Sequence, residues 1–179
     1  RMLNPKEESY FDLPLNANTP APLYDHCVRA IKHALNFGDQ GLPLIGTGDW
    51  NDGFDKIGQH GKGESVWLAF FLSEFLNSFE KIAGSRNDIT FSDTCKNESD
   101  KLKENIDKHA WDGRWYKRAW FDDGTPLGSK TNEECKIDSI AQSWSVLSGG
   151  GNESRVYTAM ESAYKDLVQK DAGIIKLLE

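Results

Sequence analysis

The feature that most constrains the fold of this chain is a run of large apolar residues over 65–83. Apolar side chains lie on nearly every side of a helix drawn through this segment: Val66, Trp67, Leu68, Phe70, Phe71, Phe75, Leu76, Phe79 and Ile82. A helix that is apolar nearly all round must be buried on most of its circumference. Ser65 precedes the run and predicts its N-terminal cap, with Glu64 favourable at the positive end of the helix. Other elements of the fold are therefore expected to surround this helix.

Amphipathic segments that can supply this cover recur along the chain. Apolar residues at three- and four-residue spacing predict further helices over 22–37, 92–110, 138–148 and 153–169. Ser92-Asp93 and Asn152 are the predicted N-caps of the second and the last of these. Aromatic and basic residues alternate between Asp-Gly turns over 111–124, which predicts short strands forming one short β-hairpin. We expect an all-α fold of two helical layers, as in an α/α toroid, with residues 1–21 as an extended arm or loop.

Composition excludes several classes of function. The net charge is −7 and 27% of residues are charged, so contact with nucleic acid or an anionic membrane is not expected. The longest apolar runs are too short to cross a bilayer, and no signal segment opens the chain. Three widely separated cysteines, Cys27, Cys95 and Cys135, favour neither a disulfide framework nor a zinc site. They indicate a reducing compartment, and we expect the cytoplasm.

The candidate for chemistry is the glycine-rich loop Gly41–Gly53, which contains Asp49, Trp50, Asn51 and Asp52 in succession. Carboxylates and amides hydrogen-bond sugar hydroxyls, and an indole face stacks on the C–H face of a pyranose ring. The same composition also suits a plain surface turn, because Asn, Asp and Gly are turn residues. From the residues alone both interpretations stay open.

The two carboxylates of this loop constrain the reaction type. An inverting hydrolase needs an acid and a base about 6.5–9.5 Å apart with water between them. Neither a helical nor an extended loop places Asp49 and Asp52 in that way, and Glu133 or Glu134 is the local alternative for a base. Phosphorolysis needs one acid, because phosphate is itself a nucleophilic anion. A single acid in a tryptophan-containing loop therefore fits phosphorolysis more simply.

Each of the other polar or aromatic candidates has a structural interpretation as well as a functional one. Gln142, on an apolar helix, can reach a substrate hydroxyl or satisfy backbone groups. Residues 61–65 resemble a phosphate-cradling turn before a helix, yet lack the P-loop spacing and more simply cap the helix. The aromatic residues of 111–120 can stack on sugars or plug one end of the helices. No metal is expected, because the calcium-like alternation in the loop meets His60 where an EF-hand has Glu.

Taken together, the motifs resemble glycoside hydrolase family 94. The resemblance rests on five segments in order: Leu23–Ala30, Gly41–Gly53, Gly61–Leu68, Asp112–Tyr116 and Ile137–Trp144. That family holds inverting phosphorylases of β-glucosides and the phosphorylase-like domain of cyclic β-1,2-glucan synthases, and this loop is most similar to the β-1,2-glucan members.

The resemblance implies an (α/α)6-barrel catalytic domain, of which residues 1–179 are a central fragment. It implies that Asp52 is the general acid and that Trp50 lines the sugar subsite. From the residues themselves, Asp49, Asn51 and Gln142 are added as candidate substrate-binding residues. The family's other sugar-binding and phosphate-binding segments have no match here, so the fragment is expected to be incomplete alone.

The function that follows is inverting phosphorolysis, or reverse synthesis, of β-linked glucosides, with β-1,2-gluco-oligosaccharides favoured. Inorganic phosphate is the co-substrate, α-glucose 1-phosphate the product, and no metal or organic cofactor is needed. Two alternatives remain: an inverting hydrolase on a similar toroid, and a non-catalytic sugar-binding or structural domain. The sequence leaves homo-oligomer formation open.

Overall fold

The structure is a computed structural model that describes residues 13, 15–16 and 19–179. The chain forms two compact units, Arg1–Ala34 and Leu35–Glu179, which are described separately. In the first unit, α1 spans Leu23–Ala34, three residues shorter at its C-terminal end than the predicted 22–37. The predicted arm over 1–21 lies largely outside the described residues.

The second unit contains four α-helices, two short helical turns and five two-residue strands. In chain order the elements are η1 (Asp52–Phe54), β1 (Glu64–Ser65), α2 (Val66–Ser85), α3 (Ile89–Asn105), η2 (Ile106–Ala110), β2 (Ala119–Trp120), β3 (Pro126–Leu127), α4 (Ser139–Leu147), α5 (Glu153–Leu167), β4 (Val168–Gln169) and β5 (Ile174–Ile175). η1 is a 3₁₀ turn and η2 is a π-helical turn that continues α3.

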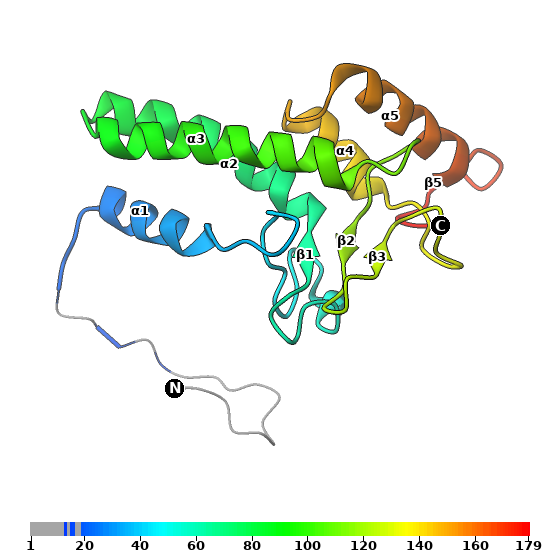
Figure 1. Ribbon diagram of the computed structural model, residues 1–179, viewed down its shortest axis with the longest axis horizontal. Helices are drawn as coiled ribbons and strands as arrows, with labels where there is room; N and C mark the ends of the chain where they lie inside the picture. Colours follow the sequence, from blue (N-terminus) through cyan, green and yellow to red (C-terminus); the bar gives the residue numbers. More distant parts are fainter. Residues whose placement is uncertain (1–12, 14, 17–18) are drawn as a thin grey trace. The chain divides into compact units, whose positions relative to one another are not determined.

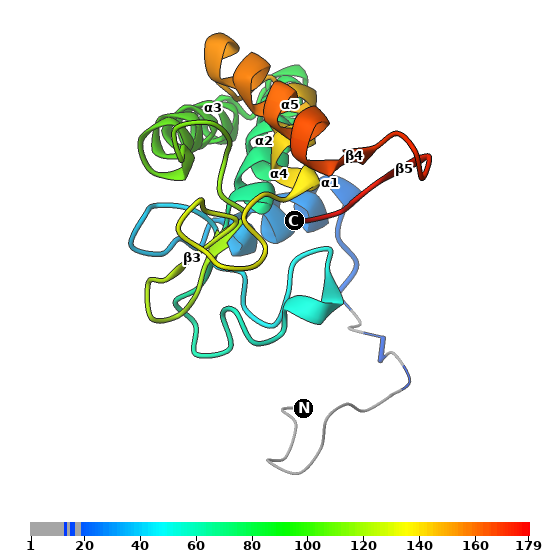
Figure 2. The ribbon, with the colours of Figure 1, turned by 90° about the vertical axis from the view of Figure 1, so that its right-hand side faces the viewer.

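The α2–α3 hairpin forms the main core of this unit. The Ser65 hydroxyl accepts a hydrogen bond from the Leu68 backbone N–H, so the predicted cap of α2 is confirmed. Buried residues of these two helices include Val66, Phe70, Leu76, Phe79, Phe91, Cys95 and Leu102. Phe71, Phe75 and Ile82 of α2 are exposed, so the expected burial of this helix on most of its circumference is found only in part. Figures 1 and 2 show the two helices side by side, with α2 between α3 and the α4–α5 pair.

The predicted start of α3 is wrong by three residues. Asp88, not Ser92 or Asp93, is the N-cap, and its carboxylate accepts a hydrogen bond from the Phe91 backbone N–H at 3.1 Å. Ser92 instead donates its hydroxyl to the Glu80 carbonyl oxygen on α2. The helix thus begins at the earlier acid, and Ser92, inside the first turn, links α3 to α2.

A small antiparallel sheet lies at the N-terminal end of α2 (Figure 1). Its strand order is β1-β2-β3, with Glu64 opposite Trp120 and Ala119 opposite Leu127. The predicted hairpin is therefore present, but it lies over 119–127, and Glu64–Ser65 supplies a third strand that the sequence does not suggest. Trp115, Tyr116 and Trp120 are buried, in agreement with a plugging role for this aromatic segment.

The last helices match their predictions closely. Asp138 caps α4 by accepting from the Ile140 N–H, and Asn152 caps α5 by accepting from the Arg155 N–H. The β4–β5 hairpin that follows, with Val168 opposite Ile175, was not predicted. The second unit is thus mostly helical with two small sheets, which agrees with a helical fold class.

Candidate active site

The glycine-rich loop is folded by its own backbone and by one amide side chain. The Gly48 N–H donates to the Ile45 carbonyl oxygen, with φ of Gly48 at 135°, a conformation that other residues rarely adopt. The Asn51 side chain accepts from the Gly53 N–H at 3.0 Å and so caps η1. The loop therefore presents residues 50–52 at a sharp turn between two fixed ends.

The predicted acid and the predicted sugar platform are both accessible on this turn. Asp52 begins η1 and is exposed, and Trp50 is 49% exposed. Within the described part of the chain, no hydrogen bond from the protein engages the Asp52 carboxylate. It is therefore free to meet a ligand, as a group that protonates a leaving oxygen must be.

Asp49, three residues earlier, has a different environment. Its side chain is fully buried and forms an ion pair with the buried guanidinium of Arg118, with N–O distances of 2.7 and 2.8 Å. It also accepts from the Ser65 hydroxyl at 2.7 Å and from the Asn51 N–H at 3.1 Å. Both Asp49 oxygens are thus engaged by the protein. This geometry favours a positioning role for Asp49 and separates it from Asp52.

Arg118 lies between two acids. Its Nε is 3.5 Å from an oxygen of Asp138, an ion pair without hydrogen-bond geometry, in addition to its two bonds to Asp49. Burial alone would raise the pKa of Asp49, but the hydrogen bonds and charge of Arg118, with help from Ser65, bring it below its ordinary value. Burial raises the pKa of Asp138, and Arg118 offsets this only partly. The guanidinium is therefore committed chiefly to Asp49.

Gln142 is completely buried, and its hydrogen bonds go to backbone. Its Nε2 donates to the carbonyl oxygens of Tyr116 and Asp138, and its Oε1 accepts from the Tyr116 N–H at 2.8 Å. Of the two interpretations open from the sequence, these contacts are those of a residue that satisfies backbone groups. Its assignment to sugar binding stays a prediction that this geometry does not favour.

A pocket of about 210 Å³ opens beside Trp50 and is lined by Trp50, Trp67, Ile140 and Trp144. Trp67 and Trp144 come from α2 and α4 and meet edge to face, with ring centroids 5.9 Å apart. In the sequence both tryptophans fall on apolar helix faces, which predicts core residues and not site residues. Each lies in the first two turns of its helix, near the end that carries the cap Ser65 or Asp138, which is the signal that could have found them.

The remaining candidates lie apart from this pocket. Glu133 and Glu134 are exposed on the loop after β3. Glu64 is buried and accepts hydrogen bonds from the Gln40 and Leu42 N–H groups, both at 2.8 Å.

The turn before α2 binds a carboxylate of the protein itself. The backbone N–H groups of His60, Lys62 and Gly63 all donate to the Asp122 carboxylate. The turn that resembled a phosphate cradle therefore already holds a carboxylate, which favours its interpretation as a structural turn before the helix.

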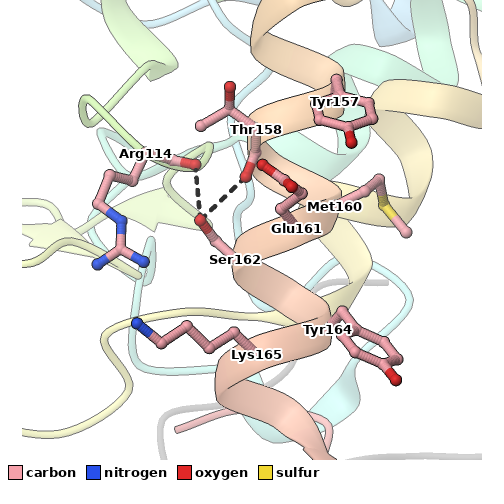
Figure 3. Close-up of a pocket in the computed structure, with 8 residues that line it drawn as sticks. All are labelled: Arg114, Tyr157, Thr158, Met160, Glu161, Ser162, Tyr164 and Lys165. Atoms are coloured by element: carbon pink, nitrogen blue, oxygen red, sulfur yellow. Dashed lines mark hydrogen bonds between the residues drawn. The ribbon is translucent and has the colours of Figure 1, made fainter.

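A second hollow, of about 520 Å³, runs along the face of α5 (Figure 3). Its floor includes Ser162, which donates to the carbonyl oxygens of Arg114 and Thr158. None of the predicted site residues lines it, so we place the candidate active site at the loop and its tryptophan pocket.

Within the described residues, no group of three His, Cys, Asp or Glu side chains is arranged to hold a metal ion. No helix of that part is both long and apolar enough to cross a membrane.

Comparison with known proteins decides the family. The family profile described as "Glycosyl hydrolase 94 superfamily, catalytic domain" matches residues 4–179. The chain belongs to glycosyl hydrolase family 94. Among its relatives, the cyclic β-(1,2)-glucan synthase NdvB of Rhizobium meliloti (strain 1021) is 43% identical over 168 residues, which is 93% of this chain and 6% of that protein.

Two phosphorylases are also similar to this family 94 chain. The solabiose phosphorylase of Paenibacillus borealis is 34% identical over 71% of this chain, which is 17% of that protein. The N,N'-diacetylchitobiose phosphorylase of Vibrio furnissii is 28% identical over 87% of this chain, which is 19% of that protein. The chain thus spans less than a fifth of the length of each of these relatives.

Proposed function

We propose that this chain is a central part of an (α/α)6-barrel catalytic domain that transfers a glucosyl unit from a β-linked glucoside to inorganic phosphate with inversion. The product is α-glucose 1-phosphate, and the reverse reaction is synthesis. Membership of family 94 and relatives named as phosphorylases and as a β-(1,2)-glucan synthase support this proposal. The similarity to the synthase favours β-1,2-linked gluco-oligosaccharides as substrates.

One observation carries the proposal: an exposed, unengaged carboxylate lies two residues from the tryptophan that lines the pocket. Asp52, in its protonated form, donates its proton to the glycosidic oxygen as the bond from that oxygen to C1 breaks. A phosphate oxygen attacks C1 from the opposite face, so the configuration inverts. Asp52 is left as a carboxylate, and the former glycosidic oxygen becomes a hydroxyl of the leaving sugar.

The engagement of Asp49 supports phosphorolysis over hydrolysis. A hydrolase needs a second carboxylate to activate water. Asp49 cannot easily serve, because Arg118, Ser65 and the Asn51 N–H occupy it. Phosphate needs no such base, so Asp52 alone suffices on this chain.

Trp50 is assigned to stack on the sugar ring, with Trp67 and Trp144 as the other apolar walls. Asn51 holds the turn through its cap on η1, and its contact with sugar remains a prediction. No metal or organic cofactor is required by this reaction, in which phosphate is the co-substrate. A cytoplasmic location also remains a prediction, based on three separated free cysteines.

The test uses the complete protein in which this chain occurs. It is assayed with β-1,2-gluco-oligosaccharides, with and without phosphate, for release of glucose 1-phosphate. We expect Asp52→Asn to lower kcat by about 10²–10⁴-fold, the usual contribution of a general acid. The matched control is Asp55→Asn, an exposed acid at the other end of η1, which should keep near-normal turnover.

Three outcomes would contradict the proposal. Glucose release without phosphate would indicate a hydrolase. Sugar binding without any product would indicate a binding domain. Near-normal turnover by Asp52→Asn would remove this residue from the role of acid.

A further inference from the structure

Arg118 reaches both ends of the turn that displays Asp52 and Trp50. On one side its guanidinium pairs with both oxygens of Asp49, and on the other it lies over the Phe54 ring, 4.8 Å from the ring centroid. Asp49 is three residues before Asp52, and Phe54 is two residues after it. One buried side chain therefore contacts the turn on either side of the proposed acid.

The same guanidinium also contacts the helix that forms the opposite wall of the pocket. Its Nε lies 3.5 Å from Asp138, which caps α4, and α4 carries Ile140 and Trp144. Its Nη1 lies 3.2 Å from the Ser65 hydroxyl, which caps α2, the helix that carries Trp67. The segments that bear the acid and the tryptophans thus meet at one cation.

The contacts of the Arg118 guanidinium require an arginine side chain. A guanidinium is planar and presents several donors in a fixed fork, so it can bind a carboxylate at two points and stack on a ring at the same time. A lysine keeps the charge but provides a single point of contact. Arg118 is itself 1% exposed, so it does not reach substrate from its position.

We propose that Arg118 is a positioning residue that fixes the distance between the proposed acid Asp52 and the tryptophan pocket. The inference rests on the proposed function, since it assigns Arg118 a role in that reaction. Arg118 acts through Asp49 and Phe54 on the turn, and through Asp138 and Ser65 on the two helices. Misplacement of a reacting group by about 1 Å can cost about 10²-fold in rate, so a loosened turn lowers kcat.

The test compares Arg118→Lys with Arg114→Lys in the complete protein. Arg114 is an exposed arginine four residues earlier on the same segment, where it pairs with Asp166 instead. We expect Arg118→Lys to lower kcat by about 10–100-fold with KM changed by less than about threefold, because ring stacking in the pocket persists. Arg114→Lys should match the wild type in both constants. An equal loss in the two variants, or a loss confined to KM, would overturn the inference.

Amide hydrogen exchange provides a readout that does not depend on turnover. In Arg118→Lys, exchange should speed up over residues 47–54 and stay unchanged in the middle of α2 and α3. Wild-type exchange over 47–54 would refute the positioning role even if the protein proves to have no phosphorylase activity. If the wild type shows no phosphorolysis but Arg118→Lys gives the expected exchange pattern, only the proposed function is refuted.

A second variant covers the case in which Arg118→Lys fails to fold. Phe54→Leu removes the ring that stacks on the guanidinium and leaves the buried ion pair in place. We expect a smaller fall in kcat, about 3–10-fold, with faster exchange confined to the same turn. Wild-type kcat and exchange in this variant would count against the inference.

Discussion

At the scale of the residue, Gln142 illustrates how a buried amide is matched to its surroundings. It both donates to and accepts from the backbone of Tyr116, and in this way it joins α4 to the segment before β2. An ionised glutamate of the same length cannot replace both bonds, because a carboxylate accepts hydrogen bonds but donates none. The local pattern around Gln142 indicates burial, but its partner is 26 residues away.

The first prediction concerns this residue. Gln142→Met leaves the Tyr116 N–H and carbonyl groups without their partner, which costs about 1–3 kcal/mol for each buried group. We expect a lower free energy of unfolding in chemical denaturation, with any loss of sugar affinity no greater than the loss of folded protein explains. Ser143→Ala, at the next position of the same helix, is the control. Unchanged stability with a large loss of sugar affinity would return Gln142 to the sugar site.

Asp49 and Asp52 show what the sequence can and cannot predict for a site. The motif places both in one loop, and the family resemblance assigns the acid to Asp52. The pattern does not reveal that Asp49 is buried, because its partner Arg118 lies 69 residues along the chain. The tryptophans of α2 and α4 were missed for a similar reason: an aromatic residue on an apolar helix face looks the same whether it faces a core or a pocket.

At the scale of the element, helix boundaries follow from capping chemistry where the cap is local. Ser65, Asp138 and Asn152 were predicted as caps or as the start of their helices, and each has the expected bond to a backbone N–H two or three residues on. α3 is different because two acids and a serine compete for its start. Two-residue strands such as β1 leave no sequence signal, since their pairing is set by the strands beside them.

The second prediction separates the observed cap of α3 from the one that the sequence suggested. Asp88→Ala removes a carboxylate that accepts from the Phe91 N–H, so we expect a loss of about 1 kcal/mol in the free energy of unfolding. Asp93→Ala, one turn into the helix and exposed, should cost much less. Chemical denaturation of both variants measures the difference. A larger loss in Asp93→Ala would contradict the boundary at Asp88.

At the scale of the whole second unit, the charge cluster of Asp49, Arg118 and Asp138 joins segments that are distant in sequence. The glycine-rich loop, the segment at β2 and the start of α4 each contribute one charged residue to it. Removing one partner of a buried ion pair leaves an uncompensated charge and costs about 3–5 kcal/mol. The mostly helical fold class could be predicted from periodicity, but this cluster, which connects the helices, could not.

The third prediction follows from the pKa of Asp49. Because the folded state lowers this pKa below its ordinary value of 3.8, the stabilisation by Asp49 is present above that value. It is lost as the pH falls through the lowered pKa. We therefore expect Asp49→Asn to be less stable than wild type at neutral pH, with a difference that shrinks below about pH 4. Denaturant unfolding at several pH values measures it, and a difference independent of pH would contradict the ionised state of Asp49.

The separation of Asp49 from Arg118 along the chain also has a consequence for the order of folding. The α2–α3 hairpin is closed by a short connection, so its contacts are local and inexpensive in loop entropy. The bond between Asp49 and Arg118 spans 69 residues, so closing it costs more chain entropy unless the intervening hairpin has already formed. We therefore expect the turn that carries Asp52 to become ordered after this hairpin when the chain folds.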